Sequence, residues 1–117
     1  MAIAVVAGVP KTGFILNATS ADLSGGETIL AGVAGKQIVV RHMTISNSSV
    51  GALTVTVGGG VGAGAVTTPY VGPVSLLSGQ SLQWTFYEGL WLAAAVALCC
   101  DASGAGAVLI FVQGTVE

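Results

Sequence analysis

The sequence predicts an all-β fold, a single-domain antiparallel β-sandwich of about eight strands. Short runs of Val, Ile, Thr and aromatic residues alternate with Gly-rich or Ser-rich segments, and they recur at the spacing of roughly 8 to 12 residues that is typical of sandwiches. No segment sustains the i, i+3, i+4, i+7 apolar pattern of an amphipathic helix. The chain has 117 residues, enough for one domain. Among sandwiches, we expect the jelly-roll topology.

The regular pattern begins at Glu27, and each expected strand is an apolar or alternating run bounded by turn residues. The expected strands span residues 28–31, 37–47, 52–57, 66–71, 74–77, 82–86, 90–92 and 107–116. The apolar run over 90–100 is long enough to suggest a helix, but the even rhythm of strands around it favours a strand, a bend and a second strand.

The long strand over 37–47 contains two apolar alternations in opposite phase. Ile38 and Val40 share one phase, whereas Met43 and Ile45 share the other. Because successive side chains of a strand point to opposite faces, the inward face must shift by one residue between these pairs. The sequence therefore predicts a β-bulge in the middle of this strand.

Four further segments have individual signatures. The clean alternation over 52–57 predicts a hairpin partner of the long strand, and the glycines of 58–64 predict a flexible loop. Pro69 cannot donate a ladder hydrogen bond, so its strand should lie at a sheet edge or cross between sheets. The strand over 107–116 is apolar on both faces, which predicts that one face packs in the core and the other against a neighbouring subunit.

Residues 1–26 differ from the rest of the chain, because only 3–6 and 14–16 form short apolar runs between turn residues. We therefore divide the chain into an N-terminal arm, residues 1–26, and a sandwich domain, residues 27–117. The opening apolar stretch has no preceding positive charge, since Lys11 follows it, and so it does not have the pattern of a signal peptide.

The low charge of the chain excludes several kinds of partner. Only 7% of residues are charged, against about 25% in ordinary soluble domains, so we expect much of the surface to be covered by another protein. The net charge is −2, and the basic residues Lys11, Lys36 and Arg41 are scattered, so no direct nucleic-acid contact is expected. The longest apolar run falls far short of the ~20 residues of a membrane-spanning helix.

No cofactor or metal site is expected from the residue types present. Residues 60–65 loosely match a dinucleotide-binding glycine pattern, but a predicted strand follows where that pattern requires a helix. Cys99 and Cys100 are adjacent and point to opposite faces, so they should remain two reduced, buried thiols. A metal site would need more ligands than these thiols and the single histidine, His42.

Catalysis is not expected either, so the chain is not predicted to be an enzyme. His42 has no nucleophile motif or neighbouring carboxylate in the sequence, and a small hydrolase using it is the least favoured alternative. The acidic residues occur singly in loops or at the terminus: Asp22, Glu27, Glu88, Asp101 and Glu117. Trp84, Tyr87 and Trp91 flank the corner at 88–89, where they form either an aromatic platform for a sugar or protein, or ordinary core and rim packing.

From Glu27 to the end, the succession of turns and strands resembles small virion proteins of tailed bacteriophages, in particular capsid decoration (cement) proteins. The segments that carry the resemblance are Gln37-Ile38-Val39-Val40, Met43-Thr44-Ile45-Ser46, Thr54-Val55-Thr56-Val57, Gly72-Pro73-Val74, 82–86, Gly89-Leu90-Trp91 and Gly104-Ala105-Gly106-Ala107. The resemblance implies a jelly roll that trimerises on the head and binds the major capsid protein. It also implies a virion protein made in the cytoplasm of a bacterial host.

A protein of this kind needs extensive contact surface and no reactive groups. The candidate residues for a partner or subunit interface are Ile3, Val5, Arg41, His42, Trp91, Leu109 and Phe111. The arm would then extend across a neighbouring subunit, either as an added strand or in a groove. Two structural alternatives remain open: a tail or head-fibre module that binds host glycans through the aromatic corner, and a shell-forming protein in its own right.

Overall fold

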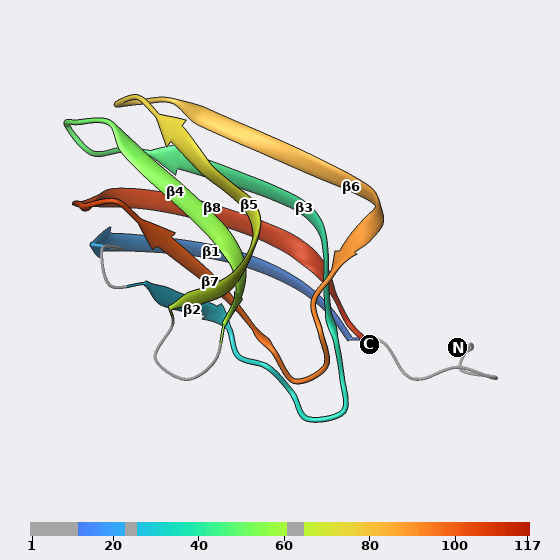
Figure 1. Cartoon of the computed structure of the whole chain (residues 1–117). Helices are drawn as coiled ribbons and strands as arrows, with labels where there is room; N and C mark the ends of the chain where they lie inside the picture. The colour runs from blue at the N-terminus through green and yellow to red at the C-terminus, as the bar shows by residue number, and fades with distance from the viewer. Residues whose placement is uncertain (1–11, 23–25, 61–64) are drawn as a thin grey trace.

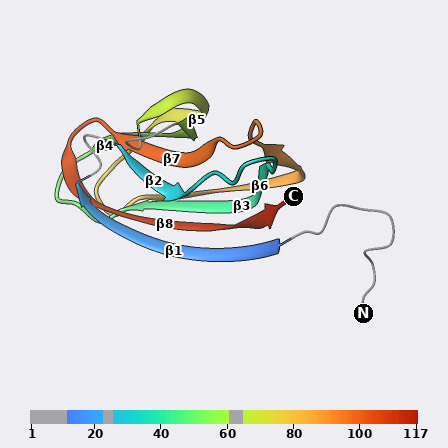
Figure 2. The same ribbon diagram turned by 90° about the horizontal axis from the view of Figure 1, so that it is seen from below.

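The structure, a computed structural model, describes residues 12–22, 26–60 and 65–117. The elements in these residues are β-strands, arranged as two four-stranded antiparallel sheets that pack face to face (Figures 1 and 2). Sheet A has the order β1-β8-β3-β6, with β1 (Thr12–Asp22), β8 (Ala105–Val116), β3 (Ile38–Asn47) and β6 (Ser81–Trp91). Sheet B has the order β2-β7-β4-β5, with β2 (Glu27–Leu30), β7 (Ala97–Ala102), β4 (Leu53–Gly60) and β5 (Val66–Leu76).

The pairing of the strands identifies the predicted jelly roll. β1 pairs with β8, β2 with β7, β3 with β6 and β4 with β5, all antiparallel. The chain is thus one long hairpin whose successive pairs alternate between the two sheets, which is the arrangement of a jelly roll. The predicted fold class is confirmed.

The predicted bulge in β3 is confirmed. The register shifts between Val40 and His42 in both pairings of this strand, with β6 and with β8. On either side of the shift, Val40 and Met43 both point into the core and are fully buried. The strand therefore keeps its apolar residues inside although their spacing in the sequence changes phase.

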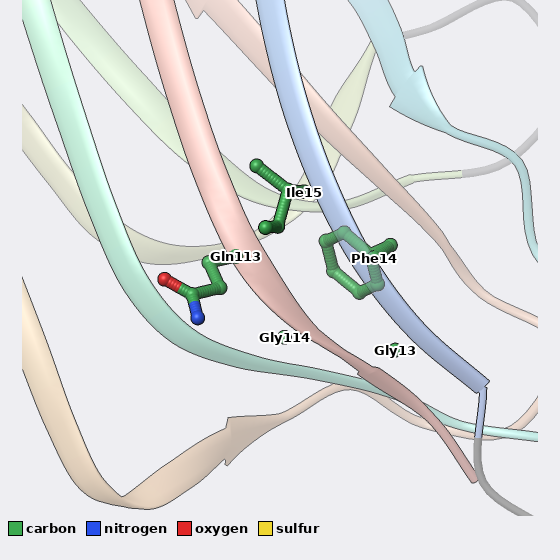
Figure 3. Close-up of a pocket in the computed structure, with 5 residues that line it drawn as sticks. All are labelled: Gly13, Phe14, Ile15, Gln113 and Gly114. Carbon is green, nitrogen blue, oxygen red and sulfur yellow. The ribbon is translucent and has the colours of Figure 1, made fainter.

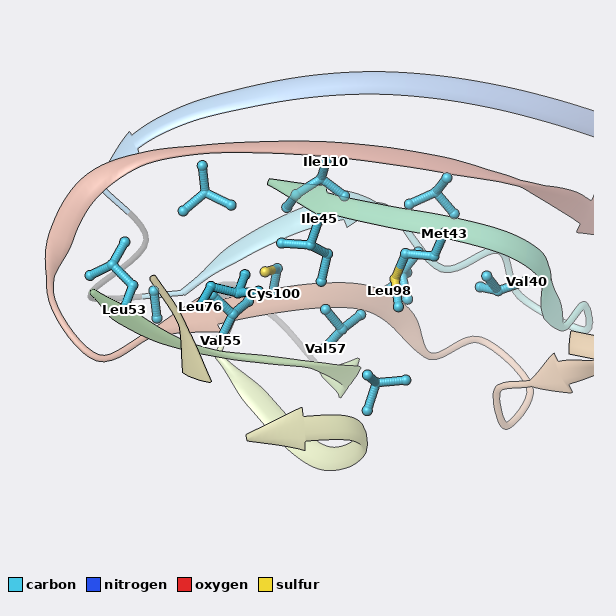
Figure 4. Packing of buried hydrophobic residues seen from close by; sticks show 14 of the residues in the cluster. Val40, Met43, Ile45, Leu53, Val55, Val57, Leu76, Leu98, Cys100 and Ile110 are labelled. Atoms are coloured by element: carbon cyan, nitrogen blue, oxygen red, sulfur yellow. The ribbon is translucent and has the colours of Figure 1, made fainter. Parts of the chain in front are cut away.

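The core lies between the inner faces of the two sheets (Figure 4). Met43 and Ile45 from β3 face Val55 and Val57 from β4, and all four are at most 1% exposed. The second cysteine, Cys100, lies in the same layer. Both sheets contribute aliphatic side chains, so the core is a continuous apolar layer that requires no disulfide.

β4 does not form the predicted hairpin with β3. It lies in sheet B and pairs with β5 and β7, and the turn over 48–52 carries the chain from one sheet to the other. A five-residue connection can reach roughly 16 Å, which is enough to cross the ~10 Å between packed sheets. The alternation over 52–57 identifies which face of the strand is buried, but it contains no information about which sheet the strand joins.

The glycine-rich segment after β4 begins later than predicted. Gly58, Gly59 and Gly60 belong to β4 and are buried, and residues 61–64 lie outside the described residues. A Cβ atom on Gly58 would overlap the carbonyl oxygen of Thr68 in β5. Gly58 therefore allows β4 and β5 to approach each other closely, which a residue with a side chain would prevent.

β5 confirms the edge position predicted from Pro69. It is the last strand in the order of sheet B, so the missing N–H of this proline interrupts no inner ladder. The two segments expected over 66–71 and 74–77 are one strand, Val66–Leu76, that continues through Gly72 and Pro73.

The structure places residues 12–22 in the sandwich, which shortens the predicted arm of residues 1–26. β1 pairs with β8 over most of its length, and Phe14 packs against the core. The apolar run of β1, residues 14–16, is only three residues long. β1 is a strand because it pairs with β8, which lies at the other end of the chain. Residues 1–11 lie outside the described residues.

Candidate interaction surface

The outer face of sheet A gathers three of the predicted interface residues, His42, Leu109 and Phe111, on one surface. Side chains in the phase opposite to the core form rows across the sheet, as the strand register shows. We define the outer face of sheet A by these residues: Ile15, Asn17, Thr19, Leu109, Phe111, Gln113, His42, Thr44, Ser46, Ser81, Gln83 and Thr85. None of them is an acid, a lysine or an arginine, so partners can approach this face without desolvating a formal charge when His42 is neutral.

His42 lies in the middle of this face with both ring nitrogens in hydrogen bonds. Nδ1 is 3.2 Å from Oγ1 of Thr85 on β6, and Nε2 is 3.4 Å from Oγ1 of Thr44, which lies on β3 like His42 itself. The ring also contacts Phe111 edge-on, with centroids 5.9 Å apart and an angle of 67° between the planes. These contacts with two threonine hydroxyls and one aromatic ring fix the imidazole in place on the sheet.

Apolar side chains are exposed beside this polar network. Ile15 is 66% exposed and Leu109 is 44% exposed, on the adjacent strands β1 and β8. The hydroxyls of Ser46 and Ser81 are 2.7 Å apart and hydrogen-bond to each other. The face therefore combines internally paired hydroxyls with exposed aliphatic side chains.

Arg41 and Trp91 lie at the end of the same sheet, next to the bulge. Nη2 of Arg41 is 3.5 Å from Oε2 of Glu117, which also accepts a hydrogen bond of 2.8 Å from the hydroxyl of Thr115. Trp91 pairs with Val39 and donates its indole N–H to the carbonyl of Glu88 at 3.0 Å. Arg41, His42, Leu109 and Phe111 are thus brought together by β3 and β8, and Trp91 borders them.

The aromatic corner divides into two kinds of residue. Trp84 faces inward and packs against the core, as the packing interpretation predicted. Tyr87 is 93% exposed and Trp91 is 44% exposed. Gly89 forms the corner with a φ of 83°, and a Cβ there would lie 2.5 Å from a methyl group of Val39. The corner therefore folds tightly over the sheet and presents two rings to solvent.

Sequence reasoning did not identify β1 as part of this surface. The sequence pattern places Ile15 in the arm, although the alternation of Phe14 and Leu16 with Ile15 and Asn17 is a signal that could have identified a strand.

A shallow depression of about 420 Å³ lies at the start of β1 (Figure 3). Its lining residues are Gly13, Phe14, Ile15, Gln113 and Gly114. Ile3 and Val5 lie outside the described residues.

The two cysteines are free and buried, as the sequence predicted. Cys100 lies in the core cluster, whereas Cys99 has the opposite phase and its sulfur is 3.8 Å from the hydroxyl of Thr28 on β2. Burial, followed by the negative charge of Asp101, raises the pKa of the Cys100 thiol from 9.0 to about 12. A thiol that stays protonated at neutral pH is not a nucleophile.

Among residues 12–22, 26–60 and 65–117, no group of three or more His, Cys, Asp or Glu side chains is placed to hold a metal ion. The same residues contain no helix with the length and hydrophobicity needed to span a bilayer. No family model matches the chain. No curated protein matches it either.

Proposed function

We propose that this chain is a structural virion protein, a capsid decoration protein that binds the major capsid protein lattice as a homotrimer and stabilises the head. The observation that carries the proposal is the outer face of sheet A, a broad strand surface whose defining residues include no acid, lysine or arginine; the Arg41–Glu117 ion pair lies at its end. A protein that only holds neighbouring capsid subunits together requires contact area and no reactive group. The fold and the resemblance described above support the same role, and the protein would be made in the host cytoplasm and assembled onto the virion.

Exposed apolar side chains on this face would form the centre of the contact. Leu109 lies beside Phe111 on the strand that was predicted to be apolar on both faces, and burying such residues contributes roughly 25 cal/mol per Å² of apolar surface. Contact regions of this kind concentrate their binding energy in a few central residues. Substituting one of them with a charged residue should therefore disrupt assembly.

The experiment compares two leucines that are both exposed but differ in position. Leu109→Glu places a charge on the outer face of sheet A, whereas Leu77→Glu places the same charge in the turn between β5 and β6, outside the residues that define that face. We expect unmodified protein and Leu77→Glu to form trimers in light scattering, to co-sediment with capsids that lack this protein and to raise their heat resistance. Leu109→Glu should remain folded by circular dichroism and lose assembly.

The proposal is contradicted if the unmodified protein is a monomer that ignores capsids, or if both variants assemble equally well. The second candidate, a glycan-binding module, is favoured by one observation, the exposed rings of Tyr87 and Trp91. Aromatic rings stack on sugars, but sugar sites also require several polar side chains around the ring. Retention of the monomer on a glycan array, lost in Tyr87→Ala, would support that candidate instead.

A further inference from the structure

The sandwich has four edge strands, and they differ in how they are protected against pairing with another chain. β1 and β6 are the edges of sheet A, and β2 and β5 are the edges of sheet B. An edge strand presents unpaired N–H and C=O groups, and natural proteins protect such edges with proline, charge, bulges or short length.

Three of the four edges carry these protections. β5 contains Pro69 and Pro73, which cannot donate a hydrogen bond. β2 is only four residues long and begins with a charged residue, Glu27. In β6, the residues between Thr85 and Leu90 have no paired partners on β3, so the edge is irregular there.

Between Thr12 and Ser20, β1 carries none of these protections, since its register shift and its charged residue, Asp22, lie at the end of the strand. It is eleven residues long, and residues 13–21 contain no proline and no charged side chain. Its register with β8 is continuous from Thr12 to Ser20, so this length of the edge is regular. A long, regular and uncharged edge is a template for an additional strand.

The side chains of β1 show what kind of strand would fit. Ile15 is 66% exposed on the outer face, and Phe14 and Leu16 are only partly buried on the inner face. The depression beside Ile15 is lined in part by Gly13 and Gly114, which provide no side chain to fill it (Figure 3). An added strand should therefore be apolar on both of its faces.

Residues 3–6 of the same sequence, Ile-Ala-Val-Val, are apolar in both phases and are separated from this edge by five residues in the chain. Folding back onto β1 of the same copy by a two-residue hairpin would require a positive φ at the first loop position. Pro10 at that position is restricted to φ near −65°. A five-residue loop over 7–11 is compatible with a hairpin in one copy, and the homo-oligomer of the proposed function favours pairing between copies instead.

We propose that residues 3–6 of a second copy of this chain pair with the free edge of β1 and add a fifth strand to sheet A. The contact is heterologous, because the segment of one copy meets a different segment of the next; such contacts form a closed ring when the rotation between copies closes, and a trimer is a ring of three. The inference rests on the homo-oligomer of the proposed function and names the contact that would hold it together.

The test is disulfide trapping in the full-length chain. Val5→Cys, or Val6→Cys for the opposite phase, is combined in turn with Ile15→Cys, Asn17→Cys and Thr19→Cys, followed by mild oxidation and non-reducing electrophoresis. The matched control pairs the same N-terminal cysteine with Gln83→Cys on β6, the other edge of sheet A. The native thiols are buried and should not interfere.

We expect covalent dimers and trimers with the β1 positions and at least tenfold less product with Gln83→Cys. Cross-links within one chain, or no preference for β1 over β6, would overturn the inference. A covalent product that stops at the dimer would keep the β1 contact and contradict the trimer. In uncross-linked protein, Ile3→Asp combined with Val5→Asp should dissociate the oligomer, whereas an intact oligomer would also overturn the inference. Because no capsid is used, these results are independent of whether the protein binds a capsid.

Discussion

Asn47 is the buried polar side chain that joins the two sheets, and its removal should destabilise the fold. It is 1% exposed at the end of β3. Its amide nitrogen donates to the carbonyls of Gly51 and Leu76, both at 2.9 Å. Its oxygen accepts from the backbone N–H of Ser49 at 2.9 Å and from the Ser49 hydroxyl at 2.6 Å. These bonds connect sheet A, the crossing turn and the end of β5 in sheet B.

Asn47→Ala removes all four hydrogen bonds. The single hydrogen of the Ser49 hydroxyl is shared between Asn47 Oδ1 and the carbonyl of Gly51, 2.7 Å away, and in the variant it can donate to Gly51 alone. The main cost therefore falls on the Leu76 carbonyl and the Ser49 N–H. Each buried group left without its partner costs about 1–3 kcal/mol. We therefore expect the free energy of unfolding to fall by about 3 kcal/mol, which for a domain near 100 residues lowers Tm by roughly 12–24 °C.

Urea unfolding followed by circular dichroism measures this change, and the midpoint should move without a change in the slope m. Asn17→Ala makes the same chemical change on the exposed outer face of sheet A and should alter stability by less than about 0.5 kcal/mol. Asn47→Asp keeps an acceptor for Ser49 but loses both donated bonds and buries a charge, so it should also destabilise. If Asn47→Ala is as stable as the Asn17→Ala control, the role assigned to this side chain is refuted.

Two further substitutions test the packing and the buried thiol. Gly114→Ala places a Cβ against the carbonyl oxygen of Val39, next to the bulge, and should lower the free energy of unfolding in urea by about 1–3 kcal/mol. In the control, Gly51→Ala, the new Cβ meets no atom within 4 Å, so stability should not change. Equal stability of the two variants would refute the close approach of Gly114 to Val39. The pKa of Cys100 is raised from 9.0 to about 12 in the folded protein, so its contribution to stability should be complete below pH 9.0 and decline toward pH 12 as the unfolded thiol ionises first. Unfolding measured across this range should show a shallower decline in Cys100→Ala, and identical pH profiles would contradict the raised pKa.

Features that depend on neighbours in the chain were predicted from the sequence. The two alternation phases around Ile38 and Met43 place the bulge, because each residue's face follows from the period of two in a strand. Pro69 indicates an edge strand, because the lack of an N–H is a property of that residue alone. The burial of both thiols also follows from residue type and local pattern.

Features that depend on the partner strand required the tertiary structure. Nothing within residues 12–22 shows that β8, at the other end of the chain, stabilises β1 as a strand, and nothing in 52–57 distinguishes a hairpin from a crossing between sheets. The buried hydrogen bonds of Asn47 likewise depend on Leu76, which lies 29 residues away.

The candidate surface shows the same division. The sequence identified Arg41, His42, Leu109 and Phe111, because an apolar or unusual residue in the outward phase is visible locally. Only the pairing of β1, β8 and β3 placed His42, Leu109 and Phe111 on one face, with Arg41 at its end, and added Ile15 to it. The sequence by itself thus determined most of the strands, their inward faces and the lack of charge, because these follow from residue type and a period of two. The tertiary structure decided which strands meet, because pairing joins segments whose distance in the chain leaves no local pattern.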